Sequence, residues 1–309
     1  MKLSIVVITY NQEQFISQTL DSIIRQKCDF EFEIIIGDDC SKDGTRNILA
    51  SYQKKYPNII KPIYNERNLG IVLNYFNAIS HCTGEYIMEC GGDDWFEEDK
   101  IMHQIQYLDS NLNIGLCYGL SRIYNHTKQK FEKNILGKAG ANFESLLNED
   151  FIPASTICFR RKLFEDYISD INPVEKDWLM EDYPLVLWFS INSEIGFLDE
   201  ILLNYRVLPN SASHTSDIEK TMAFLDSVNN VKNFFIAKYK RNDFRISESQ
   251  MKKCWMMAND RKYKRTEIVK ELETANDRNE KDSKFRHICN VPILFFLYRL
   301  RLYLKGSLS

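Results

Sequence analysis

The sequence predicts an α/β fold, with a mostly parallel sheet flanked by helices and a helical extension at the C-terminal end. Short apolar runs rich in β-branched residues alternate with helix-like segments over the first hundred residues. Strands of that composition are typical of parallel sheets that are covered on both faces. The segments after residue 216 are highly charged and read as helices.

The first elements follow in order. Residues 3–8 (LSIVVI) predict a buried strand. Asn11, with Gln14 three residues later, is typical of a helix cap, and the apolar residues after it recur every four positions, as on one helix face. The next expected elements are a strand at 32–37, a helix at 45–55, a strand at 59–64, a helix at 71–81 and a strand at 85–90.

Beyond residue 100 the pattern is less regular. We expect helices at 100–110, 178–191, 217–240 and 247–282. Strands are expected at 114–124, at 154–160 and at 197–206, the last of which is predicted to leave the core. This organisation predicts one large domain over residues 1–215 and a helical extension over 216–309.

Composition excludes some classes of protein. The net charge of −3 gives no overall basic field, so no nucleic-acid partner is expected. The eight cysteines are scattered singly without CxxC spacing, which argues against structural zinc and suits a reducing cytosol. The apolar run near the N-terminus is too short for a signal peptide, and no stretch is long enough for a transmembrane helix. We therefore expect a cytoplasmic protein.

Three polar clusters directly follow predicted strands. They are Thr9-Tyr10-Asn11, Asp38-Asp39 and Asp93-Asp94, the last preceded by Gly91-Gly92. Ligands of open α/β sheets bind beyond the carboxyl ends of the strands, so the fold would bring these clusters to one edge.

The adjacent carboxylates at the last of these clusters predict a cation site. Two such groups in a crevice repel each other, and Mg²⁺ or Mn²⁺ would neutralise them while bridging to substrate phosphates. The alternative is a solvated acidic turn with an aspartate as helix cap. For Asp38-Asp39 the alternatives are an Asx-rich turn and a carboxylate that accepts hydrogen bonds from a ligand.

The segment 291–305 (VPILFFLYRLRLYLK) is aromatic and apolar with interspersed basic residues. It is too short and too charged to span a bilayer. Two interpretations stay open: a peripheral helix on an anionic membrane surface, and a helix packed on its own domain or on a partner subunit, as in a homo-oligomer.

Five motifs then occur in one order along the chain. They are SIVVITYNQEQFISQTLDSIIRQ, EIIIGDDCSKDGT, NERNLG, TGEYIMECGGDDW and MEDYPLVLW. Together they resemble the family 2 glycosyltransferases, which have the GT-A fold. The strong resemblance covers residues 1–100 and implies a nucleotide-binding half there. Weaker similarity continues to about residue 215, and residues 101–215 would form the acceptor half.

The resemblance implies roles on the donor side. Thr9, Tyr10 and Asn11 match positions that contact the nucleoside, and Asp39, with Asp38 beside it, matches the carboxylate that binds the base, typically uracil. Asp93 and Asp94 match the end of the family's DXD-type motif, where one aspartate touches ribose and diphosphate and the next holds the metal. Gly91 stands where many members have the first aspartate, which makes Asp94 the expected metal ligand.

The resemblance also implies roles near the acceptor and the diphosphate. Glu181-Asp182 matches the acidic pair on the acceptor side, with Asp182 as general base. Arg206 and His214 match a segment that often carries a cation near the diphosphate. Many members have an arginine in the helix after the NxG turn, which this chain lacks, and Arg67 or Asn68 is the expected substitute. Without the resemblance, Asp182 would read as a helix-start carboxylate.

The expected function is inverting transfer of a sugar from a nucleoside diphosphate sugar, UDP-linked, to a hydroxyl of a glycan or lipid-linked acceptor, with a divalent metal as cofactor. The expected setting is surface polysaccharide synthesis, in the cytoplasm or at the inner face of the plasma membrane. One alternative is a sugar nucleotidyltransferase, although the TYNQEQF turn lacks the glycine and basic residue of a phosphate loop. The other is a degenerate transferase domain that acts as a scaffold.

Overall fold

The computed structural model describes residues 1–209, 217–241, 248–260, 262–273 and 280–304. The chain divides into two compact units, residues 1–146 with 150–214 and residues 147–149 with 215–309. Each unit has a hydrophobic core of its own. Among the described residues, no helix combines the length and the apolar character that crossing a membrane would need.

The first unit alternates strands and helices. Its strands are β1 (Leu3–Thr9), β2 (Phe32–Asp38), β3 (Ile60–Tyr64), β4 (Tyr86–Gly91), β5 (Trp95–Phe96), β6 (Ile114–Asn125), β7 (Lys130–Leu136), β8 (Cys158–Arg160) and β9 (Glu194–Val207). Its helices are α1 (Ile16–Ile24), α2 (Thr45–Lys55), α3 (Ile71–Ile79), α4 (Lys100–Ser110), α5 (Phe143–Asn148), α6 (Arg161–Ile171) and α7 (Asp182–Asn192), with short 3-10 turns at Ala154–Thr156 and Pro173–Glu175.

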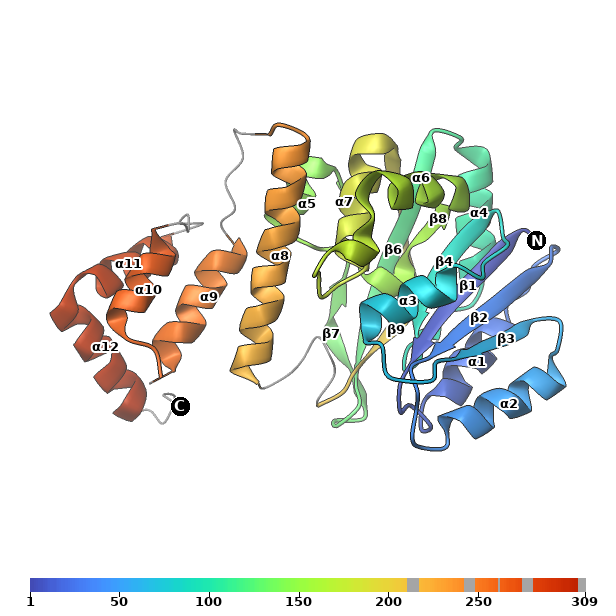
Figure 1. Cartoon of the computed structure of the whole chain (residues 1–309), viewed down its shortest axis with the longest axis horizontal. Coiled ribbons are helices and arrows are strands. Elements are labelled where there is room, and N and C mark those ends of the chain that lie inside the picture. Colours follow the sequence, from blue (N-terminus) through green and yellow to red (C-terminus); the bar gives the residue numbers. More distant parts are fainter. Residues whose placement is uncertain (210–216, 242–247, 261, 274–279, 305–309) are drawn as a thin grey trace. The chain divides into compact units, whose positions relative to one another are not determined.

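The strands form one mixed sheet in the order β3-β2-β1-β4-β8-β6-β9-β5, and β7 pairs with β6 (Figure 1). The half built from β3, β2, β1 and β4 is parallel. β8 then runs antiparallel to both of its neighbours, and β9 runs parallel to β6. In the parallel half, Thr9 pairs with Asp38 and Ile8 with Gly91, so three strands end side by side at one edge.

The core explains why the central strands are apolar throughout. Leu3, Ile5 and Val7 of β1 belong to a buried cluster that includes residues of α1 and α2. The opposite face of β1 and β2 is covered by α3. A strand covered on both faces cannot alternate apolar and polar side chains, which is the pattern read from residues 3–8.

The second unit is helical. Its helices are α8 (Ile218–Lys238), α9 (Glu248–Asn259), α10 (Arg265–Leu272), α11 (Glu280–Asn290) and α12 (Pro292–Leu304). Its core gathers Met251, Cys254, Ile268, Phe285 and Phe295, and the Trp255 ring stacks on Phe285 with 3.9 Å between centroids. The helical extension expected from the charged segments is therefore present.

Several details differ from the sequence-based expectations. Asn11 is not a helix cap, because α1 begins only at Ile16 and Asn11 has a left-handed φ of 53°. β9 does not leave the core but pairs with β6 over its length. The expected strand at 154–160 is reduced to β8, and the expected helix at 247–282 is divided among α9, α10 and α11. The β7 strand and the α6 helix were not predicted.

Candidate active site

A cavity of about 720 Å³ opens at the edge where β1, β2 and β4 end. Of the residues predicted from the sequence, it is lined by Thr9, Tyr10, Asn11, Asp39, Asp93, Asp94 and Arg206. Asp38, Asn68 and Asp182 do not line it, and His214 lies outside the described residues. The fold thus brings together most of the predicted donor-side residues from widely separated positions.

The turn after β4 is held firmly from α1. The hydroxyl of Thr19 lies 2.9 Å from the carbonyl oxygen of Gly92 and 2.6 Å from that of Asp94, and it hydrogen-bonds both. The Asp94 carboxylate, 4% exposed, accepts the backbone N–H of Arg206 at 2.9 Å and the hydroxyl of Ser155 at 3.0 Å. These contacts fix both oxygens of Asp94 before any ligand arrives, which preorganises the site.

Asp93 and Asp94 converge on the space above Gly91. A Cβ placed on Gly91 would lie 3.1 Å from Oδ1 of Asp93 and 3.3 Å from Oδ2 of Asp94. Burial raises the pKa of Asp93, and burial together with the charge of Asp93 holds the pKa of Asp94 well above its usual range. Two crowded carboxylates of this kind favour a counter-cation.

The donor set fits a divalent cation held jointly with a substrate. Mg²⁺ and Mn²⁺ prefer oxygen ligands, and Mg²⁺ is usually held by one or two carboxylates together with waters and substrate phosphates. No cluster of three or more His, Cys, Asp or Glu side chains suited to a metal occurs in the described part of the chain. Asp93 and Asp94 would therefore supply part of the coordination, and a bound ligand the rest.

Arg206 places a cation in the wall of the same cavity. Its guanidinium lies over the rings of Phe15, Trp95 and Tyr124, at 4.8, 4.7 and 5.5 Å from their centroids. Nε donates to the carbonyl oxygen of Asp93 at 2.8 Å, and a terminal N–H donates to the side chain of Gln18 at 2.7 Å. This buried, aromatic-supported cation is suited to an anionic ligand beside the carboxylate pair.

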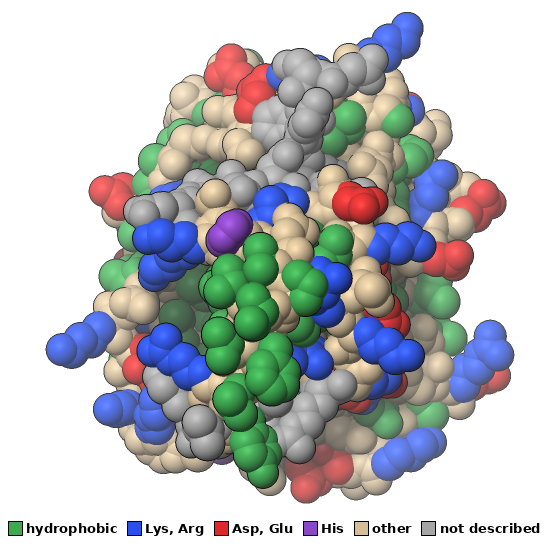
Figure 2. Space-filling model, turned by 90° about the vertical axis from the view of Figure 1, so that its left-hand side faces the viewer, with side chains coloured by type: hydrophobic (Ala, Val, Ile, Leu, Met, Phe, Trp, Pro, Cys, Tyr) green, Lys and Arg blue, Asp and Glu red, His purple; other side chains and the backbone are tan. Residues whose placement is uncertain are grey.

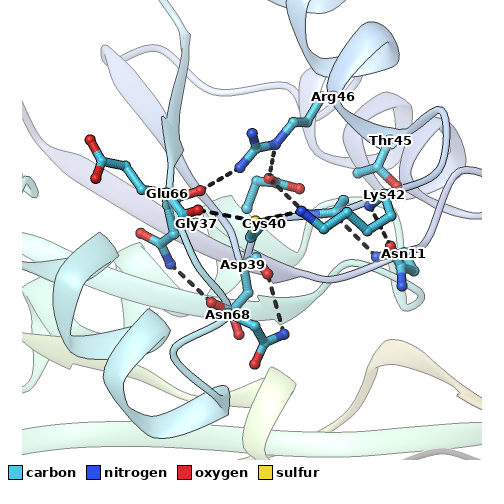
Figure 3. Close-up of polar contacts among 12 residues, drawn as sticks. Asn11, Gly37, Asp39, Cys40, Lys42, Thr45, Arg46, Glu66 and Asn68 are labelled. Carbon is cyan, nitrogen blue, oxygen red and sulfur yellow. Dashed lines mark hydrogen bonds and ion pairs between the residues drawn. The ribbon is translucent and has the colours of Figure 1, made fainter.

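Asp39 holds the loop that follows β3. Its carboxylate accepts the backbone N–H of Leu69 at 2.7 Å and of Gly70 at 2.9 Å. The side chain of Asn68 donates to the Asp39 carbonyl oxygen at 3.3 Å, and the Asn11 side chain accepts the backbone N–H of Lys42 at 2.8 Å (Figure 3). Oδ1 of Asp39 also accepts the Asn65 side-chain amide at 3.1 Å, so Oδ2 is the oxygen that keeps lone-pair capacity for a ligand of the cavity that Asp39 lines.

Asp38 lies behind the layer of residues that lines the cavity. It is fully buried and forms an ion pair with Arg46, whose guanidinium also donates to the carbonyl oxygen of Asn65. Oδ2 of Asp38 also accepts the Ser41 N–H, while Oδ1 has no hydrogen-bond partner. Asp38 therefore supports the turn that carries Asp39 and does not reach the cavity.

A second set of acidic side chains belongs to the same cavity. Glu181 and Glu89 line it, and Tyr75 donates a hydrogen bond to Glu89. Burial, with the charge of Asp182, raises the pKa of Glu181 to about 8, and burial holds the pKa of Glu89 well above its usual range. Asp182 begins α7 and accepts the backbone N–H of Tyr183 at 2.8 Å, and burial raises its pKa too.

Sequence reasoning missed three groups at this site. Glu89 could have been found, because it is a charged residue inside the otherwise apolar run of β4. Ser155 and Gln18 carry no local signal, since they act only through contacts with Asp94 and Arg206 that the fold creates.

Comparison with protein families and curated proteins places this site in context. The family model described as "Glycosyl transferase family 2" matches residues 4–168. The uncharacterized protein Rv1520 of Mycobacterium tuberculosis is 32% identical over 208 residues, 66% of this chain and 58% of that protein. The chain thus spans under two thirds of that relative's length. The putative teichuronic acid biosynthesis glycosyltransferase TuaG of Bacillus subtilis is 26% identical over 68% of this chain and 81% of its own.

Solved structures share the fold. Residues 1–349 of S. aureus TarS in complex with UDP-GlcNAc align with a TM-score of 0.58 and 18% identity, over 99% of this chain and 93% of that one. The mannosyltransferase PcManGT of Pyrobaculum calidifontis, in complex with GDP-Man and Mn²⁺, aligns with a TM-score of 0.57 and 13% identity, over 97% of this chain and 87% of that one. At these identities the likeness establishes the GT-A fold alone.

Proposed function

The chain belongs to glycosyl transferase family 2, and from this premise we propose that it transfers a sugar from a nucleoside diphosphate sugar to a hydroxyl group of a glycan or lipid-linked acceptor. The observation that carries the proposal is the convergence of Asp93 and Asp94 above Gly91 beside the Arg206 cation. A diphosphate offers the matching chemistry, because it is anionic and completes the coordination of a divalent ion.

In this proposal the nucleotide binds along the edge formed by β1, β2 and β4. Thr9, Tyr10 and Asn11 contact the nucleoside, and Asp39 accepts a hydrogen bond from the base, for which uracil is the expected partner. Asp93 serves the ribose and diphosphate. Asp38 and Asn68 act indirectly, because one supports the turn of Asp39 and the other bonds its backbone. The proposed contribution of His214 rests on the family resemblance alone.

The proposed chemistry is a single displacement. Asp182 removes the proton of the acceptor hydroxyl, and the oxygen attacks the anomeric carbon from the face opposite the diphosphate, which inverts the configuration. Asp94 holds the divalent ion, which when bound neutralises charge on the diphosphate. Arg206 adds a fixed positive charge on the side of the leaving group. Glu181 is the competing base, because it lines the cavity and Asp182 does not.

Relatives suggest the acceptor class. TuaG is named for teichuronic acid biosynthesis, and TarS was solved with UDP-GlcNAc. We extend from these names to synthesis of a surface polysaccharide with a UDP-linked donor. The family membership disfavours a sugar nucleotidyltransferase, and the complete set of Asp39, Asp93, Asp94 and Arg206 around one cavity disfavours a scaffold without activity.

A thermal-shift panel tests the donor site. The protein is heated with UDP, GDP and a series of UDP- and GDP-sugars, each with and without Mn²⁺. A ligand that binds the folded state raises the melting temperature by mass action. We expect at least one nucleotide sugar to raise it more with Mn²⁺ than without, and Asp94→Asn to remove that difference. Asp199→Asn, which changes an exposed carboxylate outside the cavity, should keep it. No shift with any nucleotide would sink the proposal.

A further inference from the structure

The last described helix, α12, is anchored to the second unit by one face. Phe295 belongs to the core of that unit, and the Tyr298 hydroxyl donates to Asn259 at 3.0 Å. The Arg299 guanidinium donates to the carbonyl oxygens of Met257, Ala258, Asp260 and Tyr263 at 2.7–3.2 Å. Because Arg299 satisfies carbonyls in the last turn of α9 and just beyond it, the orientation of α12 within this unit is fixed.

The other face of α12 is apolar and exposed. Ile293, Phe296, Leu297, Leu300 and Tyr303 are 67, 64, 52, 41 and 57% exposed. Their spacing of three and four residues puts them on one side of the helix. Figure 2 looks onto one side of the molecule and shows a green stripe with blue Lys and Arg side chains on both sides of it. Five large apolar side chains in one exposed stripe are more than scattered surface residues, and such patches mark interaction sites.

Positive and negative residues are distributed unevenly between the C-terminal part of the chain and the rest. Residues 215–309 contain 20 Lys and Arg against 12 Asp and Glu, whereas residues 1–214 contain 20 against 31. The overall charge of −3 therefore hides a strongly positive C-terminal part and a strongly negative remainder. Arg301 is exposed one residue beyond Leu300, at the border of the apolar stripe.

We propose that α12 lies on an anionic lipid surface, with its apolar stripe inserted among the headgroups, Arg301 beside the stripe, and the net positive charge of residues 215–309 attracted to the lipid charges. An apolar stripe bordered by cations matches such a surface in both respects. A second copy docked through the same stripe would bring two positive parts together, which charge repulsion opposes. This inference does not require the proposed catalytic activity, but it would bring the enzyme to a lipid-linked acceptor.

Flotation of the full chain with lipid vesicles tests the inference. The vesicles are made of phosphatidylcholine alone or of phosphatidylcholine mixed with phosphatidylglycerol. We expect binding to the mixed vesicles, weaker at high salt, and little binding to phosphatidylcholine alone. Phe296→Asp with Leu297→Asp should weaken binding by about tenfold or more, because it puts charge on the inserted face. Leu112→Asp changes a leucine of the first unit that is 81% exposed and should leave binding unchanged.

Arg301→Glu provides an independent variant that leaves the apolar stripe intact. It should weaken binding to the phosphatidylglycerol vesicles while leaving the melting temperature unchanged. The inference is overturned if the mixed vesicles bind no protein, or if the Phe296/Leu297 variant binds as well as the unaltered chain. A dimer measured by light scattering that the same variant abolishes, with no vesicle binding, would assign the stripe to a second copy. A donor-induced thermal shift tests the active site separately.

Discussion

At the scale of single residues, Gly91 controls how closely Asp93 and Asp94 approach a ligand. The missing side chain leaves both carboxylates open toward one point. Gly91→Ala would put a methyl group into that space at 3.1–3.3 Å from their oxygens, so one of them must move by a few tenths of an ångström. We expect the Mn²⁺ concentration for half-maximal activity to rise by about threefold to tenfold, because preorganised ligands are lost.

The measurement is a Mn²⁺ titration of donor hydrolysis or of the donor-induced thermal shift. Binding of the nucleotide without metal is the control, since Gly91→Ala should affect it less. If the substitution lowered metal-free nucleotide binding to the same degree as the Mn²⁺ response, Gly91 would be needed for the turn itself and not for the cation.

The acidic pair at the start of α7 gives a prediction with a pH dependence. If Asp182 is the base, Glu181 with its pKa of about 8 is protonated at neutral pH and leaves a single charge in the pair. Asp182→Asn should then lower the transfer rate by about a hundredfold or more while donor binding persists. Glu181→Gln imitates the protonated form and should retain most activity at neutral pH.

The pH profile separates the two candidate bases. The raised pKa of Asp182 means that the unaltered enzyme loses activity on the acidic side at a higher pH than an ordinary aspartate would require. Because Glu181 is already protonated below its pKa of about 8, Glu181→Gln should leave the acidic limb set by Asp182 in place. A Glu181→Gln variant that is inactive at every pH would transfer the role of base to Glu181.

The sequence located those site residues that directly follow a clear strand. Thr9, Asp39 and Asp94 end up at one cavity because β1, β2 and β4 are easily recognised and parallel. Ser155 could not be predicted from the sequence, because its role depends on a 3.0 Å hydrogen bond to the carboxylate of Asp94, which lies 61 residues earlier in the chain. The position of Asp38 behind the cavity could not be predicted either, because its ion pair with the Arg46 side chain of α2 is made only in the fold.

At the scale of elements, periodicity predicted the first half of the sheet and only part of the second, where β6 and β9 were expected but β7 was not. β1, α1, β2, α2 and β3 are continuous apolar runs or one-faced helices, and they were placed to within a few residues. β7 was missed because most of its side chains are exposed, so it lacks an apolar run. β8 is only three residues long, and it forms a strand because it pairs with β4 on one side and with β6 on the other.

Glu33 connects the parallel strands at the end of the sheet opposite the candidate active site. Its carboxylate accepts the hydroxyl of Ser4 at 2.6 Å and both the N–H and the hydroxyl of Thr83, and it forms an ion pair with Lys61. Burial alone would raise the pKa of Glu33, but the hydrogen bonds from Lys61, Ser4 and Thr83 outweigh it and lower the pKa to about 2. This one carboxylate links β1, β2 and β3 to the turn before β4.

Glu33→Gln should therefore lower the free energy of unfolding by about 1–2 kcal/mol at neutral pH. A depressed pKa stabilises the fold above the unfolded-state value, and the stabilisation is lost as pH falls from about 4.5 toward 2. The difference in the free energy of unfolding between the unaltered protein and Glu33→Gln should therefore decrease as the pH falls. Denaturant unfolding at a series of pH values measures it, with Glu31→Gln, an exposed carboxylate two residues earlier, as the control. If this difference in free energy were independent of pH, packing rather than charge would hold the strands together.

At the scale of the whole molecule, the candidate active site and the proposed lipid-binding surface lie in different parts of the chain. The cavity and the described groups that line it lie in residues 1–209, with a core of their own. The exposed apolar stripe and the positive charge lie in residues 215–309, which have a second core. We propose that this division corresponds to a transferase domain over 1–215 and a helical extension over 216–309.

A chain that ends at residue 215 should separate the two roles. Because, within the described parts of the chain, the first core draws no side chain from beyond residue 205, we expect the shortened protein to fold and to keep its thermal shift with the nucleotide sugar and Mn²⁺. It should lose binding to vesicles that contain phosphatidylglycerol, because the basic extension and α12 are gone. Circular dichroism establishes folding first, and flotation and thermal shift then read the two roles independently. If the shortened chain folded but lost the donor response, the extension would contribute to the donor site itself, and the domain boundary proposed at residue 215 would have to be abandoned.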